Sequence, residues 1–212
     1  PWKPLSELNC TYTQNKLSRV SLITDSANYI DNNLGRQNYV SEYYSTSRSP
    51  WDLEFTPNGS RIISHRGGAI EIHSDQGKKQ LGSLDVITKY ETGLLGLAID
   101  PNFNENKFIY IYYSYRKAQE DSRNSFGEFP VKNRISRFKL EENLTEEKIL
   151  INDIPGTKYH SGGRLEFGLD GYLYASTGEA GAASSRNLEK PQSLDFLGGK
   201  VLRLNTDGNI PK

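Results

Sequence analysis

The sequence predicts an all-β fold built from a repeated unit. Short strands that alternate apolar and polar residues are separated by turns of Gly, Pro, Asn and Asp, a pattern typical of β proteins rather than of helices. Similar strands recur at a nearly constant interval, because Ile70, Ile135 and Val201 are spaced by 65 and 66 residues. A repeat of this length with roughly four strands is typical of a propeller blade. We therefore expect a β-propeller with about three blades in this chain.

The first 49 residues differ from the rest of the chain. Residues 17–24 (LSRVSLIT) predict a single strand, whereas residues 25–49 are rich in Asn, Tyr and Ser and predict a loop. We expect an N-terminal extension over residues 1–49 and the first half of a longer propeller over residues 50–212.

Each repeat contains a hairpin and a strand that we expect at the outer edge of its blade. The hairpin turns are expected at residues 55–59, 99–103 and 167–171. The outer strands are expected at residues 69–72, 134–138 and 200–204. Residues 121–132, with Gly, Pro and charged side chains, predict a long connection inside the second repeat.

Composition excludes several classes of function. The 26 basic and 26 acidic residues cancel, which argues against binding to nucleic acid or to an anionic membrane surface. A single cysteine, Cys10, excludes an internal disulfide and a cysteine-based metal cluster. No stretch of the sequence predicts a transmembrane span. Sequons of the Asn-x-Ser/Thr type begin at Asn9, Asn58 and Asn143 and are compatible with a secreted protein.

Residues 159–181 (YHSGGRLEFGLDGYLYASTGEAG) predict a functional site. His160 precedes a pair of glycines, and a predicted strand follows them. Asp170 and Gly171 then provide a tight turn, so a second strand returns toward the first. This hairpin would place Glu179 at the edge of the sheet where His160 lies.

Four segments have distinctive sequences: residues 50–59 (PWDLEFTPNG), 93–103 (GLLGLAIDPNF), 160–171 (HSGGRLEFGLDG) and 199–208 (GKVLRLNTDG). Together they resemble the glucose/sorbosone dehydrogenase family, whose members use pyrroloquinoline quinone (PQQ). The resemblance implies a six-bladed propeller that carries PQQ over its central channel, with calcium nearby. It also implies an extracytoplasmic enzyme that oxidises an aldose sugar and passes electrons to an acceptor, and it places the calcium ligands beyond Lys212.

The resemblance further implies roles for individual residues. His160 matches the catalytic base, Glu179 matches an acidic residue that orients this base, and Glu91 matches a polar position facing the cofactor and the sugar. Gly162 and Gly163 would let the flat cofactor approach the backbone. The chain departs from the family at Tyr159, where the soluble glucose dehydrogenase branch has an aspartate.

A histidine suits this chemistry. Oxidation of an aldose at C1 removes a hydroxyl proton while hydride leaves for a quinone carbon. A neutral imidazole, with an ordinary pKa of about 6.5, can take that proton near neutral pH. A carboxylate beside it would fix the tautomer and stabilise the imidazolium.

Two other functions remain open from the sequence. The first is a propeller without catalytic activity that binds a protein or a glycan, and the second is a calcium-dependent hydrolase of the lactonase kind. Because function depends on the site and not on the fold, the fold cannot separate these alternatives. We also expect half of a propeller to expose apolar faces and to self-associate.

Overall fold

A computed structural model describes residues 30–31, 36–37, 48–117, 131–181 and 189–211. The chain divides into two compact units, Pro1–Ser47 and Arg48–Lys212. In the first unit, the described residues form a short antiparallel pair, β1 (Ile30–Asp31) and β2 (Arg36–Gln37). The strand predicted at residues 17–24 lies outside the described residues.

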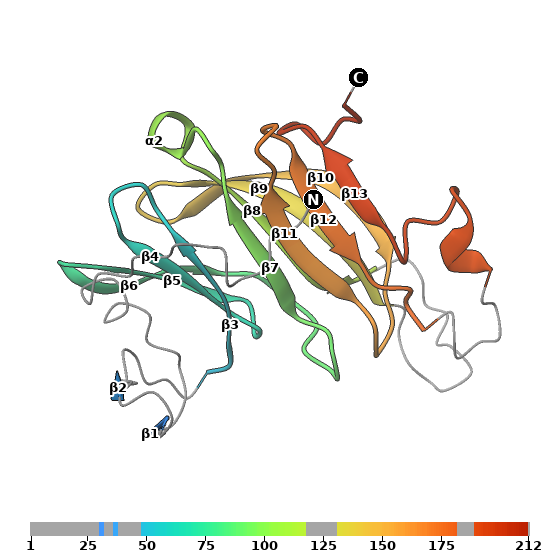
Figure 1. The fold of residues 1–212 in the computed structure, drawn as a ribbon, viewed down its shortest axis with the longest axis horizontal. Helices are drawn as coiled ribbons and strands as arrows, with labels where there is room; N and C mark the ends of the chain where they lie inside the picture. Colours follow the sequence, from blue (N-terminus) through green and yellow to red (C-terminus); the bar gives the residue numbers. More distant parts are fainter. Residues whose placement is uncertain (1–29, 32–35, 38–47, 118–130, 182–188, 212) are drawn as a thin grey trace. The chain divides into compact units, whose positions relative to one another are not determined.

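The second unit contains three antiparallel sheets, each with its strands in chain order (Figure 1). The first sheet comprises β3 (Pro50–Phe55), β4 (Arg61–His65), β5 (Ala69–Ser74) and β6 (Gly77–Ser83). The second comprises β7 (Leu94–Ile99), β8 (Phe108–Arg116), β9 (Val131–Leu140) and β10 (Leu144–Pro155), with the one-turn helix α2 (Phe103–Asn106) before β8. The third comprises β11 (Gly162–Phe167), β12 (Leu173–Thr177) and β13 (Val201–Leu204), with the 3-10 turn η2 (Lys190–Gln192) before β13. The all-β prediction with a repeated sheet is confirmed.

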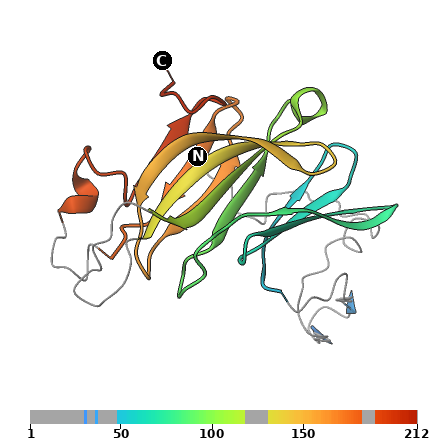
Figure 2. The same ribbon diagram turned by 180° about the vertical axis from the view of Figure 1, so that it is seen from behind.

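The strands predicted at the outer edges occupy the third position of each sheet, as β5, β9 and β13. The prediction of an outer position was wrong for the first two sheets, because β6 and β10 lie beyond β5 and β9. These edge strands are mostly exposed, as is common for sheet edges. β6 is largely polar, and β10 places Ile149, Leu150 and Ile151 next to one another, so neither strand has the apolar alternation that identified the others. Figure 2 shows β9 (yellow) and β10 (gold) side by side from behind. Most of the connection predicted at residues 121–132 lies outside the described residues, and its last two residues, Val131 and Lys132, belong to β9.

The second sheet is packed on both of its faces. Along β8, Ile109 and Ile111 pack into a core with residues of the first sheet, while Tyr110 and Tyr112 pack into a core with residues of the third. This alternation follows from the two-residue period of a strand. The tyrosine-rich segment of β8 is therefore interior packing, and all four of these side chains are fully buried.

The first strands of the three sheets are joined by close contacts. Oδ2 of Asp52 on β3 accepts a hydrogen bond of 3.0 Å from the backbone N–H of Leu97 on β7. On the other side of β7, a Cβ on Gly96 would overlap the carbonyl oxygen of Gly163 on β11. The loops that enter β7 and β11 are consequently held beside each other, and these loops carry the candidate site.

Apolar side chains remain exposed on one face of β3. Trp51, Leu53 and Phe55 are 51%, 44% and 55% exposed, respectively. In the part of the chain that the structure describes, no helix has the length and hydrophobicity needed to cross a bilayer.

Candidate active site

His160 lies in the loop that enters β11, and its backbone conformation is unusual. Its φ angle is +59°, in the left-handed region that residues with a Cβ rarely adopt. Its side chain is 56% exposed, so the imidazole is open to a ligand. Residues held in such conformations cluster at functional sites, where the surrounding structure maintains the strain.

The β11–β12 hairpin brings Glu179 into contact with His160. β11 leads away from His160, the chain turns at Gly171 with a φ of +75°, and β12 returns to the starting edge. Nδ1 of His160 is hydrogen-bonded to Oε1 of Glu179. Because a carboxylate only accepts hydrogen bonds, Nδ1 carries the hydrogen and Nε2 of the neutral ring is left as a proton acceptor.

Glu91 fixes the backbone on the other side of His160. It lies in the loop before β7, and its Oε2 accepts a hydrogen bond of 2.6 Å from the backbone N–H of His160. Its own backbone N–H donates a bond of 3.0 Å to the carbonyl oxygen of Lys158. Glu91 thus joins the loops of two sheets, in addition to any contact it makes with a ligand.

The two carboxylates act on the protonation of His160. The hydrogen bond with Glu179 raises the pKa of His160 above its ordinary value, and the charges of Glu179 and Glu91 act in the same direction. The imidazole is therefore a stronger base than an isolated histidine, and a larger fraction of it is protonated at a given pH. This arrangement suits proton abstraction followed by storage of the proton as imidazolium.

The two predicted glycines are required by contacts within the protein. A Cβ on Gly162 would overlap backbone atoms of Thr177 and Gly178, and a Cβ on Gly163 would come within 2.5 Å of the Cβ of Leu95. Gly162 is exposed, whereas Gly163 is buried. The contacts that require these two glycines are thus made by Thr177, Gly178 and Leu95, and their contact with a cofactor stays a prediction.

Sequence reasoning missed a buried tyrosine that supports the site. The phenol of Tyr112 on β8 donates a hydrogen bond of 2.9 Å to the carbonyl oxygen of Ser161, the residue that follows His160. Tyr112 is fully excluded from solvent. No signal in the sequence identified this contact, because a tyrosine in an apolar strand is usually a packing residue.

The residues of the site differ in how well they fit PQQ and calcium, the two bound groups that the resemblance implies. His160 supplies an exposed proton acceptor beside two carboxylates, which matches the proton that must leave when a quinone accepts hydride. Among the described residues, by contrast, no group of three or more His, Cys, Asp or Glu side chains could hold a metal ion. The donor set around His160 therefore fits quinone chemistry, and we derive no step through calcium.

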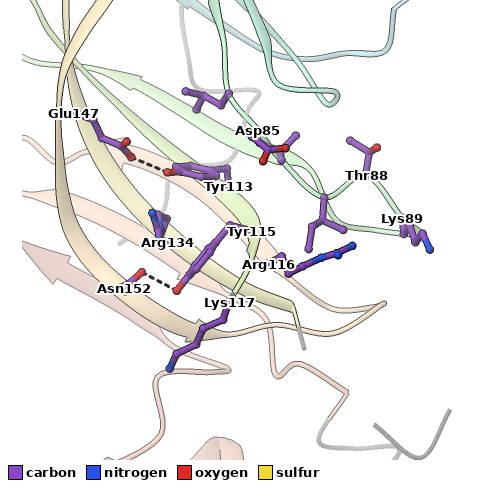
Figure 3. A pocket seen from close by; sticks show the side chains of 13 residues that line it. Asp85, Thr88, Lys89, Tyr113, Tyr115, Arg116, Lys117, Arg134, Glu147 and Asn152 are labelled. Carbon is purple, nitrogen blue, oxygen red and sulfur yellow. Dashed lines mark hydrogen bonds between the residues drawn. The ribbon is translucent and has the colours of Figure 1, made fainter. Parts of the chain in front are cut away.

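A separate cavity of about 900 Å³ lies between the segment before β7 and strands β8 to β10 (Figure 3). The Tyr113 phenol donates to Glu147 at 2.7 Å, and the Tyr115 phenol donates to Asn152 at 2.7 Å. The guanidinium carbon of Arg134 lies 3.6 Å from the centre of the Tyr115 ring. None of the predicted site residues lines this cavity.

Comparison with known families gives a match over most of the chain. A family model described as Glucose / Sorbosone dehydrogenase matches residues 47–212. The matched region includes both loops of the candidate site.

Two relatives illustrate the range of proteins that the chain resembles. The aldose sugar dehydrogenase YliI of Escherichia coli is 31% identical over 171 residues, which cover 76% of this chain and 42% of YliI. The human Hedgehog-interacting protein is 31% identical over 188 residues, which cover 81% of this chain and 26% of that protein. The first is named as an enzyme and the second as a binding protein.

Solved structures agree on the fold. The PQQ-bound aldose sugar dehydrogenase of Streptomyces coelicolor aligns with a TM-score of 0.61 and 31% identity, covering 77% of this chain and 46% of that one. The chain thus spans less than half the length of the relatives compared here.

Proposed function

The chain belongs to the glucose/sorbosone dehydrogenase family, and we propose that the full-length protein oxidises aldose sugars at C1 to lactones with PQQ as the hydride acceptor. The pair formed by His160 and Glu179 carries this proposal. An exposed imidazole whose Nδ1 is held by a carboxylate presents Nε2 as a proton acceptor, which the reaction requires.

In the proposed reaction, Nε2 of His160 takes the proton of the C1 hydroxyl group. The C1–H bond breaks at the same stage, its electron pair leaves as hydride, and the C1–O bond becomes a carbonyl. PQQ, when bound, supplies the electrophilic carbon that accepts this hydride. In the neutral ring, Glu179 fixes the tautomer whose hydrogen is on Nδ1 and leaves Nε2 as the proton acceptor, and it stabilises the imidazolium after the step.

Glu91 and the exposed backbone of Gly162 are the cofactor contacts in this proposal. Both flank His160, so a flat molecule lying on them would have the base at its edge. Gly163 contributes indirectly, because it allows β11 to pack closely against β7. The proposal also includes bound calcium, transfer of electrons to an external acceptor, and a location outside the cytoplasm.

The exposed apolar face of β3 supports self-association of the isolated 212-residue chain. Trp51, Leu53 and Phe55 form a contiguous apolar stripe on that strand, and such patches favour association. Sedimentation velocity would measure it, and a monodisperse monomer would contradict it.

Reconstitution tests the proposed activity. The full-length protein, incubated with PQQ and Ca²⁺, should reduce a redox dye only when an aldose is added. Replacement His160→Gln preserves polarity and removes the base, so kcat should fall by roughly 10²- to 10⁴-fold. If the loaded protein reduces no dye with any aldose, the proposal is wrong.

A second candidate function is binding without catalysis. The match to the Hedgehog-interacting protein over 81% of this chain favours a propeller that recognises a protein or a glycan. In that case the loaded protein would show no redox activity, and a His160→Ala variant would bind its partner with undiminished affinity. No observation on the described residues favours a calcium-dependent hydrolase.

A further inference from the structure

Two exposed tyrosines stand directly beside the candidate site. Tyr90 precedes Glu91 and Tyr159 precedes His160, so each of these two site residues has a tyrosine as its neighbour in the chain. Their ring centres are 5.4 Å apart and the ring planes are inclined by 56°. The two residues are 51% and 47% exposed, although aromatic side chains of this size are usually buried to a large extent.

The backbone around both rings is fixed. The loops that carry them lie side by side (Figures 1 and 2), joined by the hydrogen bond from Glu91 N–H to the Lys158 carbonyl oxygen at 3.0 Å. The Nε–H of Arg66 donates a bond of 2.9 Å to the carbonyl oxygen of Thr92, and its Nη2 donates to the carbonyl oxygen of Tyr90. The Tyr90 ring therefore projects from a constrained turn.

The conformation of Tyr90 adds a second observation. Its φ angle is +56°, a region where residues with a Cβ are strained. Tyr90 and His160, one in each loop, thus share a left-handed backbone conformation beside the same group of side chains. The turn from Lys89 to Thr92 holds this conformation, since the backbone N–H of Thr92 donates a hydrogen bond of 3.1 Å to the carbonyl oxygen of Lys89.

We infer that Tyr90 and Tyr159 form an aromatic platform that binds the pyranose ring of the sugar substrate. One face of a pyranose consists largely of C–H groups, and the electron-rich face of an aromatic ring attracts such polarised hydrogens. The hydroxyl groups at the edge of the sugar would then meet the carboxylates of Glu91 and Glu179. The ammonium of Lys158 lies over one face of the Tyr90 ring, 4.9 Å from its centre, so the sugar is expected on the opposite face. This inference rests on the proposed function and assigns its substrate-binding surface.

The experiment uses the full-length protein loaded with PQQ and Ca²⁺. Variants Tyr90→Ala and Tyr159→Ala should each raise KM for an aldopyranose by about three- to ten-fold, with kcat changed less than two-fold. Tyr→Phe variants keep the ring and should stay within two-fold of the parent KM. Tyr159→Leu keeps apolar bulk without a flat face and should resemble Tyr159→Ala.

Tyr172 provides the matched control. It lies at the opposite end of the β11–β12 hairpin, where its ring stacks on the guanidinium of Arg203. Replacement Tyr172→Ala should leave KM unchanged. Unchanged KM in both Tyr90→Ala and Tyr159→Ala, in an enzyme that remains active, would overturn the platform while leaving the proposed function intact.

A binding measurement separates the platform from the chemistry. A methyl glycoside has no free C1 hydroxyl group and cannot be oxidised, so its binding can be followed by saturation-transfer NMR without turnover. Weaker binding in the Tyr→Ala variants supports the platform even if no aldose is oxidised. Undiminished binding in these variants overturns it.

Discussion

The backbone N–H of His160 donates a hydrogen bond of 2.6 Å to Oε2 of Glu91, a residue 69 positions earlier in the chain. Replacement Glu91→Ala removes the acceptor that holds the left-handed His160 backbone. A hydrogen bond to a charged group contributes about 1.5–3 kcal/mol when well shielded, and less at an exposed site. We therefore expect kcat/KM of the loaded full-length enzyme to fall by about ten-fold, because the base is no longer held in position.

Glu142 provides the control for this change. It is an exposed glutamate in the turn between β9 and β10, away from His160. A Glu142→Ala variant should retain the parent kcat/KM. Equal activity of Glu91→Ala and Glu142→Ala would show that the bond to His160 does not matter for catalysis.

The pH dependence of the reaction should reveal the influence of Glu179 on His160. Their hydrogen bond raises the pKa of His160, and the base must be neutral to accept a proton. Activity should therefore increase with pH and level off above a midpoint that is higher than for an ordinary histidine. Replacement Glu179→Gln removes the charge, so the midpoint of the kcat/KM profile should move to lower pH while the plateau falls. An unchanged midpoint in the Glu179→Gln variant would show that Glu179 does not affect the pKa of His160.

The sequence predicted the elements of this site better than their contacts. The alternation around Leu165 and the turn at Asp170 identify the β11–β12 hairpin, because both signals are local. Glu179 could be placed beside His160 for the same reason, since the hairpin alone brings them together. The bond between Glu91 and His160 joins the loops of two sheets, and no local pattern encodes such a contact.

The glycines show a related difficulty. A glycine signals a close approach or an unusual backbone angle, but it does not say what approaches. At Gly163 the neighbour that the structure shows is Leu95 of the adjacent sheet. The edge strands β6 and β10 were missed because neither alternates apolar and polar residues: β6 is largely polar, and the apolar residues 149–151 of β10 are consecutive.

The contact between Tyr112 and the carbonyl oxygen of Ser161 predicts a positioning role that can be separated from stability. Replacement Tyr112→Phe removes one buried hydrogen bond and should lower the free energy of unfolding by about 1 kcal/mol. The variant should also lose several-fold in kcat, since Ser161 follows His160. Tyr110→Phe is the matched control, because its buried phenol donates a bond of 2.6 Å to Asp100. It should lose at least as much stability, because its acceptor is a buried carboxylate, and it should keep kcat. A parallel loss of kcat in both variants would contradict the positioning role.

Glu54 on β3 should make the stability of the folded protein depend on pH. Burial raises the pKa of Glu54 from 4.5 to about 7, the negative charges of Asp52 and Glu166 add to this, and Arg164 opposes it. The folded state then retains a proton that the unfolded chain releases, so this stabilising contribution is complete below pH 4.5 and is lost as the pH rises through about 7. In the Glu54→Gln variant, the free energy of unfolding should change less between pH 4.5 and about 7 than in the parent protein. Urea midpoints measured across this pH range would test it. An unchanged slope in the variant would assign the pH dependence to other groups.

Gly96 provides the strictest test of how β7 and β11 pack beneath the site. A Cβ at this position would overlap the carbonyl oxygen of Gly163, and backbone on both sides leaves no flexible side chain to yield. Gly96→Ala should therefore destabilise the protein by about 3 kcal/mol and also lower activity, because separation of the two strands moves His160.

Two other glycines provide controls. Gly67→Ala, where the added Cβ meets nothing within 4 Å, should change the free energy of unfolding by less than about 0.5 kcal/mol. Gly171→Ala also has open space but a φ of +75°, so it should cost about 1 kcal/mol from backbone strain alone. Thermal and urea denaturation of the three variants separate overlap from strain, and a Gly96→Ala protein as stable as Gly67→Ala would show that the two sheets are not in contact at this point.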